Sequence, residues 1–190
     1  MFVEPAVINR APGNLELIRA FVNTWNIEHG QEALLGPAQI QAWLAAHQLM
    51  AEDEPVSQGD FEEIIRFREA LRALLVLNND GPLEAGTMET LNQLSQKLCL
   101  RVEFEAAEAV HLASVERGVA GAMGQLLGIV FTAMIDGSWS RLKACHNHGC
   151  RWAFYDLSKN RSATWCATTI CGSRLKARAY RRRQRAVRAE

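Results

Sequence analysis

The chain has 190 residues, of which 48% are hydrophobic, so it can form one domain with a real core plus a small appendage, and disorder is excluded. Its formal net charge of zero hides a division. Residues 141–190 carry 13 Lys and Arg against 2 acidic residues, a net charge of +11, and residues 1–140 carry 8 against 19, a net charge of −11. This division indicates an anionic partner for the basic part, with nucleic acid ahead of an acidic membrane surface.

The five cysteines do not form a disulfide framework in a chain of this size, and four of them form a paired array that favours a reducing compartment. We expect the fifth, Cys99, to be a small buried hydrophobe and not a reactive thiol. Residues 1–10 lack a positively charged segment followed by an apolar one, so no secretory signal is predicted. The expected location is therefore the cytoplasm.

Four helices are predicted before residue 100. The first is capped by Asn14 and is ended by Gly30, and the second covers about 37–48, with Pro37 in its first turn. After an acidic connector at 51–60, a third helix begins at Phe61 and stops at the turn cluster 78–82. Thr87 caps a fourth helix that runs to Lys97, with four apolar side chains directed inward: Met88, Leu91, Leu94 and Leu98.

A β-hairpin and an uncharged helix follow. Apolar and charged residues alternate from Leu100 to Glu105, and Val110 and Leu112 belong to the returning strand. Residues 118–135 contain no charge, and their length reaches the threshold for a transmembrane helix. Four glycines and Gln125 argue against a membrane span, and they favour a fully buried central helix with a smooth face for close packing.

The strongest motif is two pairs of cysteines with equal spacing: Cys145-x4-Cys150, fifteen residues, and Cys166-x4-Cys171. Four thiolates close a tetrahedral shell around zinc and leave no position for water, so a structural zinc ion is predicted. A pair of disulfides or an iron–sulfur cluster remains the alternative. We expect His146 and His148 to be exposed loop residues, and Lys143, Arg151 and Arg174 to offset the negative charge of the thiolates.

The segments around the first cysteine pair predict a short hairpin that holds the metal, and residues 156–160 have the composition of a turn. Trp152, Phe154 and Trp165 are predicted to be the small core of this zinc module. Base stacking by these rings is the alternative.

A basic helix follows the last cysteine. Gly172 and Ser173 supply its tight approach and its N-cap, and the helix begins near Arg174. Cations at helical spacing repel one another with almost no acid to relieve them, which favours phosphate binding over a merely solvated face. The predicted stripe is Arg174, Arg178, Arg181 and Arg185, widened by Lys176, Arg182, Arg183 and Arg188.

The pattern Cys-x4-Cys-Arg-Trp-x-Phe-x-Asp-x-Ser-Lys-Asn-Arg-x3-Trp-Cys-x4-Cys-Gly-x-Arg, from Cys145 to Arg174, resembles the CGNR zinc finger. Segments beginning at Leu15, Ile40, Arg68 and Gly137 resemble the ABATE-type domain, which precedes this finger in bacterial proteins regarded as stress-induced transcription regulators.

The resemblance implies zinc ligation by Cys145, Cys150, Cys166 and Cys171, and it implies DNA contact by Gly172 and Arg174. The family's asparagine is Ser173 here. Serine can cap a helix but cannot make the bidentate contact that asparagine makes to an adenine edge, so the sequence leaves open whether this position reads a base.

Together these patterns predict a mainly α protein with a small β-hairpin, in the α+β class. A helical ABATE-type domain covers 1–138, and a treble-clef-like or ribbon-like CGNR-type zinc module covers 139–190 and ends in the basic helix. One structural zinc ion is expected.

The predicted function is that of a cytoplasmic bacterial DNA-binding transcription regulator in the stress response. The alternative is a protein–protein interaction module, or an RNA binder, whose basic tail docks on an acidic surface. We find no nucleophile–base pairing and no phosphate loop, so no enzyme is predicted. The helical part senses a small-molecule effector or forms a homodimer, and no membrane partner is expected. The predicted nucleic-acid contacts are Gly172, Ser173, Arg174, Arg178, Arg181, Arg182 and Arg185.

Overall fold

A computed structural model describes residues 10–106, 109–173, 177 and 180. Its main helices are α1 (Leu15–Val22), α2 (Pro37–Ala46), α3 (Gln58–Leu77), α4 (Thr87–Ser95) and α5 (Gly118–Ile135). Three antiparallel hairpins join β1 (Trp25–Asn26) to β2 (Gln31–Glu32), β3 (Leu100–Ala106) to β4 (Ala109–Ser114), and β5 (Leu142–Ala144) to β6 (Ala153–Tyr155). Two short helical segments are η1 (Trp139–Arg141) and η2 (Thr168–Gly172). The predicted α+β class is confirmed.

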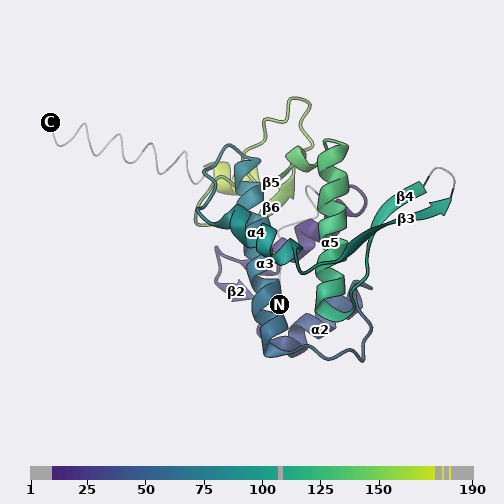
Figure 1. Cartoon of the computed structure of the whole chain (residues 1–190). Helices are drawn as coiled ribbons and strands as arrows, with labels where there is room; N and C mark the ends of the chain where they lie inside the picture. The colour runs from purple at the N-terminus through teal and green to yellow at the C-terminus, as the bar shows by residue number, and fades with distance from the viewer. Residues whose placement is uncertain (1–9, 107–108, 174–176, 178–179, 181–190) are drawn as a thin grey trace.

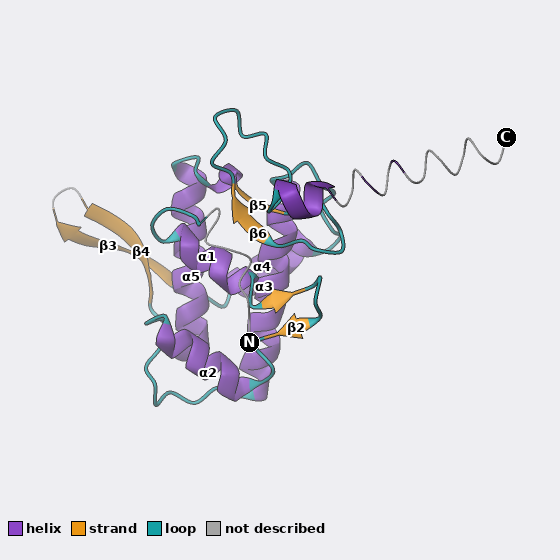
Figure 2. Cartoon of the chain, turned by 180° about the vertical axis from the view of Figure 1, so that it is seen from behind, coloured by secondary structure: helices purple, strands orange, loops and turns teal. Residues whose placement is uncertain are grey.

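The core lies between α1, α3 and α5, which contact one another pairwise. Ile18 and Phe21 of α1, Leu71 and Leu75 of α3, and Leu126 of α5 are completely buried there. Helix α2 closes one end of this bundle, and the hairpin β5–β6 lies at the other end (Figures 1 and 2). The cysteine-rich part of the chain therefore packs on one end of the helical bundle (Figure 1).

The first helix is shorter than predicted. Helix α1 ends at Val22, well before Gly30, and the small hairpin β1–β2 follows it. The helix stops because the side chain of Asn23 hydrogen-bonds to the backbone of Ala153, so a tertiary contact overrides the helical pattern. The predicted cap is also wrong: the Asn14 side chain makes no capping hydrogen bond.

The middle helices follow the sequence pattern with shifted ends. Helix α2 begins at Pro37 as predicted, and it ends at Ala46. Helix α3 begins at Gln58, inside the predicted connector, because Ser57 and Asp60 form a capping box in which each side chain accepts from the other's backbone N–H at 3.1 and 2.9 Å.

Two predictions about α4 are wrong. Thr87 is the first helical residue and not the cap, because Gly86 precedes the helix in the left-handed region with φ of 80°. Met88 is exposed, whereas Leu94 and Leu98 are buried as predicted and Leu91 packs against the core.

The predicted hairpin β3–β4 is present, and its register places Val102 opposite Leu112 and Phe104 opposite Val110. Strand β4 lies on the glycines of α5, because a Cβ at Gly124 would come within 2.6 Å of Ser114 Oγ and one at Gly128 within 3.1 Å of the Leu112 carbonyl oxygen. The glycine face is thus a packing face, as predicted, and its partner is a strand.

Cys99 stands at the entrance of this hairpin. Its carbonyl accepts the Val115 N–H at 2.9 Å, and its side chain is exposed. The prediction that it is buried is therefore wrong: the residue belongs to the rim of the hairpin and not to the core.

Helix α5 has the predicted bounds. Within the part of the chain that the structure describes, it is the one helix long and apolar enough to cross a membrane, and half of it is buried inside the protein. The prediction of a fully buried helix is wrong, because Phe131, Met134 and Ile135 are about half exposed or more. One side of α5 faces the core, and its last two turns present apolar side chains to solvent.

Candidate metal centre

The four paired cysteines are held by the hairpin β5–β6 and by η2. Cys145 directly follows β5, and its N–H donates to the Trp152 carbonyl at 2.9 Å, which continues the hairpin ladder. Cys150 closes its loop by donating to the Asn147 carbonyl at 2.8 Å. The second pair comes from a turn and a short helix, since Cys166 precedes η2 and Cys171 lies in it. A hairpin and a helix thus meet at one point, as the treble-clef-like prediction requires.

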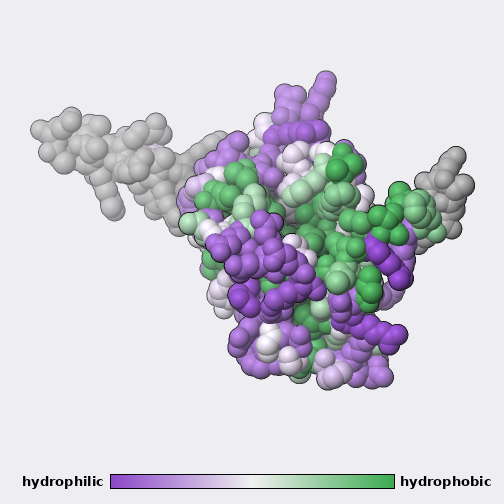
Figure 3. All heavy atoms as spheres, in the orientation of Figure 1, coloured by the Kyte–Doolittle hydropathy of each residue, from purple (hydrophilic) through white to green (hydrophobic). Residues whose placement is uncertain are grey.

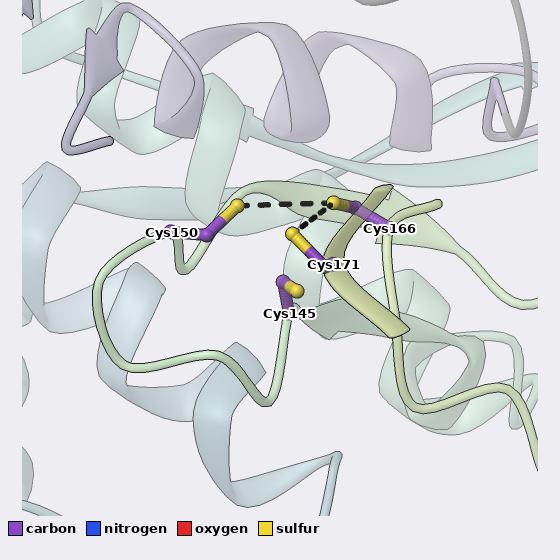
Figure 4. A group of neighbouring side chains, drawn as sticks. All are labelled: Cys145, Cys150, Cys166 and Cys171. Carbon is purple, nitrogen blue, oxygen red and sulfur yellow. Dashed lines mark hydrogen bonds between the residues drawn. The ribbon is translucent and has the colours of Figure 1, made fainter. Parts of the chain in front are cut away.

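The four sulfur atoms converge on a common centre (Figure 4). All lie within 4.8 Å of one another, with 3.7 Å from Cys150 to Cys166 and 3.8 Å from Cys166 to Cys171. A tetrahedron with zinc–sulfur bonds of about 2.3 Å has edges of about 3.8 Å. A disulfide would need about 2.05 Å, and all five cysteines are free. The cysteines fit one structural zinc ion.

The pKa values of Cys145, Cys150 and Cys166 show that these three thiols interact strongly. Hydrogen bonds from Cys150 and Cys166 lower the pKa of Cys145 to about 2. The hydrogen bond to Cys145 raises the pKa of Cys150 to about 12. Cys166 has its own hydrogen bond to Cys145, which raises the pKa of Cys166. Negative charges this close need a common cation, and zinc would supply it by binding all four as thiolates.

Aromatic and polar side chains surround the sulfur atoms. Trp152 is buried against the cysteines and Trp165 packs beside it, so the predicted small core is confirmed for these two rings. The Asn147 side chain donates to Cys171 Sγ at 3.8 Å. His146 and His148 are exposed, as expected for loop residues. The four-sulfur set therefore needs no histidine.

Lys143 and Arg151 are predicted to offset the charge of the thiolates, but both pair with carboxylates instead. The Lys143 ammonium is buried and donates to Asp156 Oδ2 at 2.8 Å and to the Arg161 carbonyl at 2.6 Å. Arg151 pairs with Glu84 at 2.6 Å. Burial by itself would raise the pKa of Asp156, but hydrogen bonds from Lys143 and Ser158 lower it below its ordinary value. The buried ion pair fixes the predicted turn after β6 instead of balancing the metal.

The helix after the last cysteine begins earlier than predicted. It starts at Thr168, with Ala167 as the residue before it, and it continues through Ser173. Ser173 is therefore inside the helix and exposed, and it is not the N-cap. Gly172 is buried, and a Cβ there would come within 3.1 Å of the Trp165 ring, so this glycine serves the predicted close approach.

The remaining predicted nucleic-acid contacts lie outside the described residues, and so do the other cations of the predicted stripe. These residues are Arg174, Lys176, Arg178, Arg181, Arg182, Arg183, Arg185 and Arg188.

Side chains at the ends of α1 and α3 anchor the hairpin β5–β6 and the segments next to it. Asn23 forms two hydrogen bonds with Ala153, with its amide group donating at 2.9 Å and its side-chain oxygen accepting at 2.8 Å. Asn78 donates to the carbonyls of Trp139 and Leu142, and Asn79 donates to those of Ala144 and Thr164. The hydrophobic core also runs without a break into the hairpin, through Leu142, Ala144, Ala153 and Tyr155.

Arg72 makes the deepest of these connections. It is almost fully buried and donates to the Val22 carbonyl at 2.6 Å and to the Arg151 carbonyl at 3.2 Å, while Glu69 pairs with its Nε at 2.8 Å. Burial lowers the pKa of Arg72. The sequence pattern places this arginine among the charges of a helix surface, and no local signal distinguishes it from an exposed one.

The comparison with known families agrees with this architecture. Residues 141–184 match the model of the CGNR zinc finger, and residues 15–136 match the ABATE model, described as "Putative stress-induced transcription regulator". No curated protein matches the chain. Since the second model covers well over half of the 190 residues, the chain belongs to the ABATE family, and its zinc centre lies in a CGNR zinc finger.

Proposed function

We propose that this protein is a cytoplasmic bacterial DNA-binding transcription regulator that uses its zinc finger to hold an arginine-rich helix against the phosphate backbone. The observation that carries the proposal is the net charge of +11 in residues 141–190, on a chain whose other residues carry −11. Phosphate contacts dominate the affinity of proteins for duplex DNA, and a cluster of arginines in a segment with few acidic residues can supply them.

The zinc centre supports this proposal by giving the helix a fixed starting point. Cys171 lies in η2, and Gly172 packs against Trp165, so the first turn is attached to the metal site on one side and to an aromatic ring on the other. Ser173 follows on the exposed side. A helix held in this way loses little freedom when it binds, so more of the contact energy remains as affinity.

The salt dependence of binding tests the proposal. We expect the logarithm of the affinity for duplex DNA to fall linearly with the logarithm of the salt concentration, with a slope near −0.9 for each phosphate contact. Replacing Arg178, Arg181, Arg182 and Arg185 by Gln should make the slope less negative by about 0.9 for each arginine that contacts a phosphate. Fluorescence anisotropy with random duplexes at several salt concentrations measures both slopes.

The matched control replaces four exposed arginines of the acidic part by Gln: Arg10, Arg66, Arg101 and Arg117. It removes the same charge from the whole chain and should leave the slope unchanged. Equal losses in the two variants would show that net charge alone drives association. A flat salt response of the wild-type protein would refute the proposal.

The opposite charges of the two parts favour a second candidate, in which the basic segment docks on an acidic protein surface, including that of its own chain. Deleting residues 175–190 separates the two. Loss of DNA binding with an unchanged melting temperature supports the DNA-binding function, whereas loss of stability or of a protein partner supports docking. Competition between duplex DNA and RNA tests the RNA-binding variant. A small-molecule effector of the helical part stays a prediction.

A further inference from the structure

The surface formed by the hairpin β3–β4 and the end of α5 has no partner within the described part of the chain. Six large apolar side chains are exposed there by 47–80%: Val102, Phe104, Val110, Phe131, Met134 and Ile135. Figure 3 shows hydrophobic side chains gathered over α5 and along the hairpin. We call these six residues the hairpin–α5 surface. We propose that it is the contact between two copies of this chain.

The two halves of the surface are continuous because of how the hairpin crosses α5. Near its base, β4 lies on the glycine face of the helix, where Leu112 and Ser114 meet Gly128 and Gly124. The strands then leave the helix and project beyond it (Figures 1 and 2). The apolar face of the hairpin therefore extends over solvent, next to the exposed last turns of α5.

The area of this surface fits a protein partner. A fully exposed aromatic side chain presents on the order of 200 Å², so Phe104 alone, at 80% exposure, contributes more than 100 Å². The six side chains together reach several hundred Å², which matches or exceeds the largest apolar patch of a typical monomer. A stable interface buries about 800 Å² on each partner. The several hundred Å² of the hairpin–α5 surface can supply the apolar share of that area.

The charge distribution selects a second copy as the occupant. None of the six side chains is charged, and the charges of β3 lie on the other face of the hairpin, where Arg101 donates to Glu103 at 2.6 Å and His111 lies 3.6 Å from the same carboxylate. Among these six side chains, an anionic or strongly basic partner would find no charge to pair with. Two identical uncharged surfaces meet without like-charge repulsion, although the chain as a whole has strongly charged parts.

The shape of this face suits a symmetric pair. A groove of about 980 Å³ lies beside the projecting hairpin, between α1, the end of α2, α5 and β4. Its lining is mixed, because apolar side chains such as Leu15, Leu112 and Ile129 alternate with polar ones that include Gln125 and Asp136. A ridge and a hollow thus lie next to each other on one surface. A twofold axis beside this face would place the ridge of each copy in the hollow of the other, as in an isologous interface.

The stability of the hairpin supports the same conclusion. An isolated two-stranded hairpin is marginally stable in water unless a helix or further strands cover its apolar face. Here α5 covers the base of the hairpin and leaves the outer part uncovered. A second copy would cover that part.

The test is the mass of the full-length, zinc-loaded protein in reducing buffer without DNA, measured by sedimentation equilibrium over roughly 0.1–100 µM, which includes the weak, micromolar end of association for standard-size interfaces. We expect a dimer with twice the chain mass of 21.2 kDa. Phe104→Asp and Ile135→Asp should each weaken dimerisation at least about 10-fold, because each buries a charge in the centre of the contact.

The matched control is Leu35→Asp, which charges an equally exposed leucine (71%) in the loop before α2 and should leave the dimer intact. All substituted side chains are exposed, so each monomer should keep its circular dichroism spectrum. A wild-type monomer at every concentration would overturn the proposal, and so would a dimer that tolerates Phe104→Asp. Flotation of the wild-type protein, but not of Ile135→Asp, with phosphatidylcholine vesicles would instead assign the surface to a membrane. None of these readouts depends on DNA binding.

Discussion

Asn23 completes the edge of a strand that lies 130 residues later in the sequence. Its side-chain amide presents a donor and an acceptor to the backbone of Ala153 in the way that a neighbouring strand would. Because both partners are buried, neither the N–H nor the carbonyl of Ala153 can turn to water instead. A single side chain therefore joins the end of α1 to the zinc-finger hairpin.

Replacing Asn23 by Ala should destabilise the protein by about 2–6 kcal/mol, since two buried backbone groups lose their partners at about 1–3 kcal/mol each. Asn14→Ala is the matched control. The sequence assigns Asn14 the role of a helix cap, whose loss would cost about 1 kcal/mol, but its side chain makes no capping bond, so we expect a change within about 0.5 kcal/mol. Urea denaturation measures both. Equal losses of unfolding free energy in the two variants would contradict the role of Asn23 as the partner of Ala153.

At the scale of elements, α5 is defined by the small residues that let another segment approach it. Its glycines give up helix propensity, about 1 kcal/mol each relative to alanine, in exchange for backbone contact with the segment that precedes it. Gly121 is the clearest case, because a Cβ there would come within 2.5 Å of the Glu116 carbonyl oxygen. That atom belongs to the backbone and cannot rotate away.

Gly121→Ala should therefore destabilise the protein by about 1–3 kcal/mol, even though alanine favours the helix. Gly59→Ala in α3 is the comparison, since the nearest atom to its added Cβ is Ser57 Oγ at 3.7 Å, an ordinary contact. This second substitution should be neutral or stabilising by up to about 1 kcal/mol. Thermal melting of the two variants measures the difference. A stabilised Gly121→Ala protein would show that the approach is loose.

The elements that the sequence predicts well are those with a local cause. The uncharged run gives the bounds of α5, Pro37 marks the start of α2, and alternation indicates the two strands of the hairpin β3–β4. The metal ligands are also local, because equal loops of four residues place two thiolates together in each pair. The family models agree with both parts of the predicted architecture.

What the sequence does not give depends on partners far away in the chain. The early end of α1 is caused by the contact of Asn23 with Ala153, and the burial of Arg72 is caused by carbonyls of two other segments. Lys143 lies two residues before a zinc ligand, yet its partner is Asp156. In each case the tertiary structure determines which group a charged or polar side chain contacts. The spacing of residues along one helix or strand contains no information about that contact.

In the whole molecule, the hairpin β5–β6 that carries the metal site belongs to the core of the helical bundle, so the two parts should unfold together. The anchors Arg72, Asn23, Asn78 and Asn79 all hold backbone groups of the zinc-finger region, and the hairpin β5–β6 supplies buried residues to the common cluster. Because zinc binds the folded chain and not the unfolded one, its binding stabilises the helices as well as the zinc finger.

We expect one zinc per chain in protein purified without chelator, and we expect Cys145→Ser to abolish it and to lower the melting temperature of the whole protein. Cys99→Ser is the matched control, because Cys99 is exposed and lies outside the cluster, so it should keep both the metal and the melting temperature. Metal analysis and calorimetry measure the two effects. A helical transition that stays unchanged in Cys145→Ser would show two independent folding units.

The joint between the two parts also has a consequence for evolution. The family models meet between residues 136 and 141, yet the finger depends on asparagines and an arginine that the helical part contributes. A finger transferred behind an unrelated domain would carry its four cysteines with it, but it would leave the backbone groups of Ala144 and Ala153 without partners. We expect recombinants at this boundary to fold only when both halves come from proteins that kept the same joint.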